Sequence, residues 1–103
     1  MSLDNIYVGD YGQPIELTVL DVDTGAAADI SGYTTSQKML FTSPAGTVTE
    51  KTSSFKTDGT DGIIRYTVEN GLLNASGNWE VRGRVANGSA VLSTEKHRFH
   101  VSP

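Results

Sequence analysis

The sequence predicts an all-β protein, an antiparallel sandwich of about seven strands. Apolar and polar residues alternate in several runs, as in Ile15, Leu17 and Val19 around Glu16 and Thr18. A period of two is typical of a strand with one buried face. Turn residues separate these runs every ~8–15 residues, which is close to the spacing in a sandwich or small barrel. No segment has an apolar stripe at helical spacing over three turns.

Each expected strand ends at a turn signal. Pro44-Ala45-Gly46 predicts the turn of a hairpin, and the pair Asp58-Gly59 and Asp61-Gly62 predicts a turn region before the next strand. Asn87-Gly88 predicts a type I′ hairpin turn, in which both central residues need a positive φ. One helical turn is expected at 70–76. The strands themselves are expected at 5–8, 14–21, 35–43, 47–55, 62–69, 78–86 and 90–101.

Two stacked sheets follow from the one-sided strands, because a single sheet would leave its apolar face in water. The N-terminal and C-terminal strands are expected at the sheet edges, where unpaired backbone groups are exposed. The expected core consists of the inward-facing apolar residues Ile15, Leu17, Val19, Met39, Phe41, Ile64, Tyr66, Val68, Trp79, Val81, Val85, Phe99 and Val101.

Composition limits the classes of function. The 103 residues are expected to form a single domain over 1–103. There is no cysteine, so neither a disulfide nor a thiolate metal site is available. The net charge is −4 and no run of lysine or arginine occurs, so nucleic acid is not expected as a partner. The apolar runs are too short for a membrane span, and no secretory signal is visible.

No constellation in the sequence predicts catalysis or a cofactor. His97 and His100 are three apart on an expected strand and point to opposite faces, so they do not form a metal pair. The acidic stretches 21–25 and 58–62 lack the full ligand pattern of a calcium loop and read as turns. Glu16 and Glu80 are expected to be outer-face charges rather than an acid pair, and no serine has an evident base beside it. We therefore expect a protein that is not an enzyme and that holds no metal.

Three tyrosines are candidates for contact with a partner, because tyrosine is a common anchor at protein and sugar interfaces. Tyr11 lies between two glycines and is the strongest of them. For Tyr7 and Tyr33 the favoured interpretation is that they pack at the ends of the sandwich, and contact with a partner is the alternative.

Several motifs occur in a fixed order along the chain. The stretch over 6–19 comes first, and it is followed by Asp29-Ile30-Ser31-Gly32, Ser43-Pro44-Ala45-Gly46-Thr47-Val48, Asp58-Gly59-Thr60-Asp61-Gly62-Ile63-Ile64-Arg65-Tyr66 and Ala75-Ser76-Gly77-Asn78-Trp79-Glu80-Val81. In this order the motifs resemble the immunoglobulin-like domain of phage baseplate upper proteins and of short stand-alone phage virion proteins, with Ala45 in place of the usual acidic residue.

The resemblance implies an immunoglobulin-like sandwich in a virion, made in the host cytoplasm and without enzymatic activity. Its partners would be capsid, neck or tail and baseplate proteins, with a homo-oligomer or symmetric array as a further expectation. The short first strand would pair with a neighbouring chain through its edge. The candidate interface residues are Ile6, Tyr7, Val8, Tyr11 and Tyr33. The alternative is a module that binds carbohydrate or a host surface through Tyr11, Tyr33 and polar loop groups.

Overall fold

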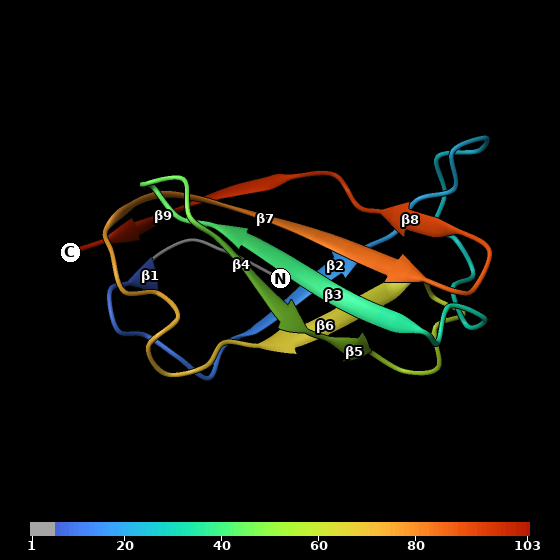
Figure 1. The fold of residues 1–103 in the computed structure, drawn as a ribbon, viewed down its shortest axis with the longest axis horizontal. Coiled ribbons are helices and arrows are strands. Elements are labelled where there is room, and N and C mark those ends of the chain that lie inside the picture. Colours follow the sequence, from blue (N-terminus) through green and yellow to red (C-terminus); the bar gives the residue numbers. More distant parts are fainter. Residues whose placement is uncertain (1–5) are drawn as a thin grey trace.

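A computed structural model describes residues 6–103 of the chain, and within this range it contains strands and no helix (Figure 1). The elements are β1 (Ile6–Tyr7), β2 (Pro14–Thr18), β3 (Ser36–Thr42), β4 (Val48–Thr52), β5 (Ser54–Phe55), β6 (Ile63–Thr67), β7 (Gly77–Ala86), β8 (Val91–Ser93) and β9 (His97–Ser102). The predicted all-β class is confirmed, and the segment 70–76 forms turns rather than a helical turn.

The strands form two sheets that face each other across the core. The larger sheet has the order β1-β9-β7-β3-β4, with β8 also paired to β7, and the smaller has the order β2-β6-β5. Figure 1 shows β7, β3 and β4 crossing in front of β2 and β6. This arrangement, with the second, fifth and sixth strands opposite the others, is that of an immunoglobulin-like sandwich. All pairings are antiparallel except that of β1 with β9.

Nine strands appear where seven were expected, because two of the predicted runs are broken. The run 47–55 is interrupted at the buried Ser53, and the chain passes there from the larger sheet into the smaller one. The run 90–101 is interrupted between β8 and β9. There the buried Thr94 hydroxyl accepts a hydrogen bond from the Gly83 N–H at 2.8 Å and donates one to the Glu95 carbonyl at 2.9 Å. At both breaks the backbone still bonds the neighbouring strand, because the Ser53 N–H donates to the Gln37 carbonyl and the Thr94 N–H to the Gly83 carbonyl, each at 2.9 Å.

All thirteen predicted core residues are buried. Two aromatic contacts join strands within the core: Phe41 meets Tyr66 across the two sheets, and Trp79 stacks on Phe99 of the neighbouring strand with ring centroids 6.4 Å apart. The loops and the first strand add further buried side chains, namely Ile6, Ala28, Ile30, Leu72 and Leu73.

The predicted turn at Pro44-Ala45-Gly46 is confirmed. Gly46 has a φ of 89° and donates its N–H to the Ser43 carbonyl at 2.9 Å. The prediction for Asn87-Gly88 is wrong in its turn type, although β7 and β8 do form the hairpin. Gly88 does not have a positive φ. The Asn87 side chain instead accepts the N–H groups of Ser89 and Ala90, so the central residues are Gly88 and Ser89.

The prediction that both terminal strands are edges is half right. β1 is an edge of the larger sheet, but the C-terminal strand β9 lies between β1 and β7. The opposite edge of that sheet is β4, and the smaller sheet has β2 and β5 at its edges. The sequence pattern shows which face of the final strand is apolar, but not which strands form hydrogen bonds with its two edges.

Candidate interaction surfaces

The candidate residues at the start of the chain lie on the edge strand β1 and the loop that follows it. Ile6 is buried at 6% exposure, so its side chain belongs to the core and is not an interface residue. The neighbouring side chains face solvent: Tyr7 is 52% exposed, Val8 41% and Tyr11 60%. We refer to Tyr7, Val8 and Tyr11 as the tyrosine loop.

Backbone hydrogen bonds hold the tyrosine loop against the sandwich. Val8 donates its N–H to Ser102 at 2.9 Å, Gly9 donates to Leu73 at 3.0 Å, and Gly12 donates to Val68 at 2.8 Å. The loop is thus tied to β9 and to the connection between β6 and β7. Its apolar side chains are presented from a fixed backbone, which lowers the entropy lost on binding.

The free side of β1 is closed to another strand. The Tyr7 N–H donates to Oδ2 of Asp10 at 3.0 Å, and the Tyr7 carbonyl accepts the Asp10 N–H at 3.0 Å. Both backbone groups that an added strand would need are therefore occupied, as in other edge strands protected from aggregation. The expected pairing with a neighbouring chain would begin at Asn5, which lies outside the described residues, and Tyr7 offers it no free backbone groups.

Tyr33 lies far from the tyrosine loop, at the opposite end of the sandwich. It lies in the connection between β2 and β3, next to Thr35, whose N–H donates to Ala86 at the end of β7. The tyrosine loop lies at the other end of β7, because Gly77 pairs with Val101 beside β1. A strand of this length separates the two places by roughly 30 Å. Tyr33 is also half-buried against the core, which agrees with packing at the sandwich end.

A groove of about 440 Å³ lies between β4 and the connection from β6 to β7. Thr49 and Lys51 project from the core side of β4, where they face Phe41 and Met39 in the pairing register. The Lys51 ammonium meets the Glu69 carboxylate at 3.3 Å across the groove. Amide side chains of Asn70 and Asn74 lie on the far wall. The sequence shows only alternation in β4 and so does not indicate that polar residues occupy its core side.

The residues considered for metal binding stay apart or form turns. In the described part of the chain, no group of three or more histidine or acidic side chains is placed to hold a metal ion. His100 contacts the Asn78 side chain on the outer face of the larger sheet, while His97 is exposed at the start of β9. Glu16 and Glu80 belong to different sheets, so they do not meet as an acid pair.

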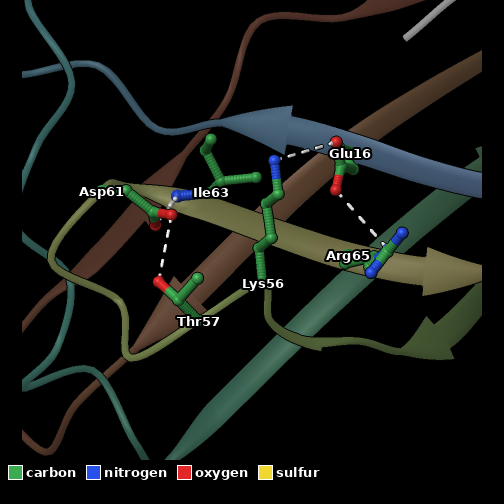
Figure 2. A network of polar contacts seen from close by, with 6 residues as sticks. All are labelled: Glu16, Lys56, Thr57, Asp61, Ile63 and Arg65. Atoms are coloured by element: carbon green, nitrogen blue, oxygen red, sulfur yellow. Dashed lines mark hydrogen bonds and ion pairs between the residues drawn. The ribbon is translucent and has the colours of Figure 1, made fainter.

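The acidic stretches are turns closed by their own side chains. Oδ1 of Asp21 accepts the Asp23 N–H at 2.8 Å. Oδ1 of Asp58 accepts both the hydroxyl and the N–H of Thr60, at 2.6 and 3.0 Å. In Figure 2, Asp61 bonds Thr57 and the Ile63 N–H in the same way, next to the ion pairs of Glu16 with Lys56 and Arg65. The carboxylates thus stabilise loop backbone.

No known protein family and no curated protein matches this sequence. Among residues 6–103 no helix is long and apolar enough to cross a membrane.

Proposed function

We propose that this chain is a non-enzymatic structural protein of a phage particle, attached to its capsid, neck or tail through the tyrosine loop. The observation that supports attachment is the exposure of Tyr7, Val8 and Tyr11 on a backbone fixed by three hydrogen bonds. The phage setting rests on the resemblance of the ordered motifs to virion immunoglobulin-like domains. Many identical weak contacts on a symmetric particle would then add up to firm attachment by avidity.

Attachment through side chains fits the local structure better than attachment through an added strand. Asp10 occupies the free backbone groups of Tyr7, whereas the two tyrosine rings are open to solvent. Aromatic rings of this kind give large contact area at a small entropic cost. A partner with a shallow apolar depression and hydrogen-bond acceptors for the phenol groups would suit them.

Mass spectrometry of purified particles tests the proposal. We expect wild-type chain to be present in a defined copy number, and the double variant Tyr7→Ser/Tyr11→Ser to be reduced at least ~10-fold, since two anchors of about 1 kcal/mol or more are removed. Val91→Ser is the matched control, because Val91 is equally exposed on β8, away from the loop. Deletion of 1–8 is less informative, since it also removes Ile6 from the core.

The outcomes separate the two parts of the proposal. Absence of the wild-type chain from particles would contradict the virion role. Presence of the double variant at wild-type copy number would contradict the role of the tyrosine loop only.

Carbohydrate binding is the second candidate, and the groove beside β4 is the observation that favours it. Its walls carry hydroxyl, amide and charged side chains from Thr49, Asn70, Asn74, Lys51 and Glu69, which suit sugar hydroxyl groups. The indole of Trp79 at the groove is buried and donates its N–H to Ala75 at 3.0 Å, so it offers no open face for stacking. Glycan-array binding that is lost in Asn70→Ala/Asn74→Ala would support this candidate.

A further inference from the structure

The outer face of the larger sheet is basic although the protein as a whole is acidic. Of the eight lysine and arginine residues in a chain of net charge −4, five lie on this face. Alternation and register place four of them on β3, β7 and β9, and the fifth, Lys96, lies beside Arg82 around a shallow depression. We call Lys38, Arg82, Arg84, Lys96 and Arg98 the basic face.

Most of this positive charge is not neutralised within the molecule. Lys38 pairs with Glu50 at 3.9 Å and Arg98 with Glu80 at 3.1 Å. Arg82, Arg84 and Lys96 have no ion pair among the described residues. Lys38 and Arg84 are direct partners across β3 and β7, and like charges in that position destabilise a sheet. Binding of a negatively charged partner to this face would offset the repulsion between Lys38 and Arg84.

The opposite charge is collected in the loops at one end of the sandwich. These loops join β2 to β3 and β5 to β6, and the Ile30 N–H donates to the Gly59 carbonyl at 2.8 Å between them. We call the five carboxylates Asp21, Asp23, Asp29, Asp58 and Asp61 the acidic end. In the described chain none of the five forms an ion pair.

Two of the five carboxylates of the acidic end, Asp29 and Asp58, are held in the charged form by hydrogen bonds. Hydrogen bonds from the hydroxyl and N–H of Ser31 hold the pKa of Asp29 below its usual range, and those of Thr60 do the same for Asp58. The two carboxylates also lie close enough to repel each other. A partner with positive charge would relieve this repulsion.

The outermost part of the acidic end has the shape of a small knob. The chain between Leu20 and Ala27, which are bridged to each other, projects from the sandwich in Figure 1. Val22 is 91% exposed and stands between Asp21 and Asp23. The basic face offers a matching site, a depression of about 40 Å³ in which Leu40 lies beside Arg82 and Lys96. Glu80 also lines this depression, and its carboxylate is paired with Arg98.

We propose that this protein self-associates head to face, with the knob around Val22 of one copy seated on the basic face of the next. Asp21 and Asp23 would pair with Arg82, Arg84 and Lys96, and Val22 would cover Leu40. The two surfaces are different regions of the chain, so a pair of copies still has one free knob and one free basic face. Such a heterologous contact builds a ring or an open row of copies.

A second copy fits this face better than a nucleic acid does. The knob brings two carboxylates with an apolar side chain between them, which matches two cations beside an apolar residue. A phosphate backbone has no such apolar group, and the net charge of −4 opposes its approach. Self-association of this kind does not require the virion role, because both surfaces belong to the chain itself.

Sedimentation velocity of charge-neutral variants tests the contact. In roughly 10 mM salt, where the Debye length is ~30 Å, we expect wild type to form species larger than a monomer as its concentration rises toward ~1 mM. In roughly 1 M salt these species should dissociate. Asp21→Asn/Asp23→Asn keeps an acceptor for the N–H groups of Asp23 and Thr24, and Arg82→Gln/Arg84→Gln keeps polar outer-face side chains. Each variant alone should remain monomeric.

Mixing the two variants gives the sharpest result. One retains an intact knob and the other an intact basic face, so the mixture should form 1:1 pairs and nothing larger. Arg65→Gln removes a positive charge from the smaller sheet, and Asp10→Asn a negative charge from the other end. Both should associate as wild type does.

Several outcomes would overturn the proposal. These are a wild-type chain that stays monomeric in low salt at all concentrations, variants that associate unchanged, or a mixture that stays monomeric. A monomeric wild type that binds a short DNA duplex through Arg82 and Arg84 would show instead that the face serves a polyanion.

Discussion

Single residues in this fold are mostly where alternation predicts, and the exceptions are residues of very short strands and residues at breaks between strands. The inward positions of β2, β6 and β7 could be predicted because every second residue is apolar. Ile6 could not, because a two-residue strand has no period to detect. Ser53 and Thr94 are polar residues at buried positions, where the chain leaves one ladder for another.

Tyr66 gives a prediction at the scale of one residue. Burial, together with the neighbouring Glu69 carboxylate, raises the pKa of Tyr66 to about 12. In the unfolded chain tyrosine titrates near ~10. Between these values the unfolded state loses a proton that the folded state retains, so Tyr66 favours unfolding increasingly as the pH rises from about 10 to about 12.

Urea denaturation at a series of pH values from roughly 9 to 12, on both sides of the pKa of an unfolded tyrosine, measures this effect. The midpoint of wild type should fall more steeply with pH than that of Tyr66→Phe, which has no phenol to ionise. Tyr7→Phe is the control on an exposed ring and should retain the wild-type slope. Equal slopes for wild type and Tyr66→Phe would contradict the assignment.

At the scale of elements, turn residues located the hairpins but not all of their geometries. Pro44 fixes φ at the position where the β3–β4 turn needs it, so the turn could be predicted from sequence. The prediction from the dipeptide Asn87-Gly88 fails, because the Asn87 carboxamide oxygen accepts the N–H groups of Ser89 and Ala90. The centre of the turn is therefore one residue further along the chain. Side-chain capping of this kind competes with backbone turn types.

A pair of glycine variants distinguishes the two turns. An added Cβ meets nothing within 4 Å at either Gly46 or Gly88, but only Gly46 has a positive φ, 89°. We expect Gly46→Ala to lower the free energy of unfolding by about 1–2 kcal/mol, and Gly88→Ala to leave it unchanged or raise it by up to about 1 kcal/mol. Chemical denaturation measures both. A decrease of similar size in the free energy of unfolding for Gly88→Ala would indicate that the turn is of type I′ after all.

At the scale of the molecule, the sequence predicts two sheets but not how the chain is divided between them. Pairing order depends on contacts between residues far apart, such as Ile6 with Val101. It also depends on the step at Ser53, which sends one predicted strand into both sheets. The basic face could not be predicted from the sequence for the same reason. Lys38 and Arg84 become neighbours only through the β3–β7 register, so the absence of a basic run says little about the surface.

The parallel pairing of β1 with β9 also determines how the domain responds to a pulling force. Tension applied before Ile6 and after Ser102 draws the two strands past each other along their length. The hydrogen bonds across them, such as Val8 to Ser102, are then loaded together in shear instead of opening one by one. We expect single-molecule pulling through these ends to require a higher force than pulling across the β3–β4 hairpin, between Lys38 and Thr52, whose antiparallel bonds unzip in sequence. A domain attached to a particle by one end would hold its shape under drag along that axis.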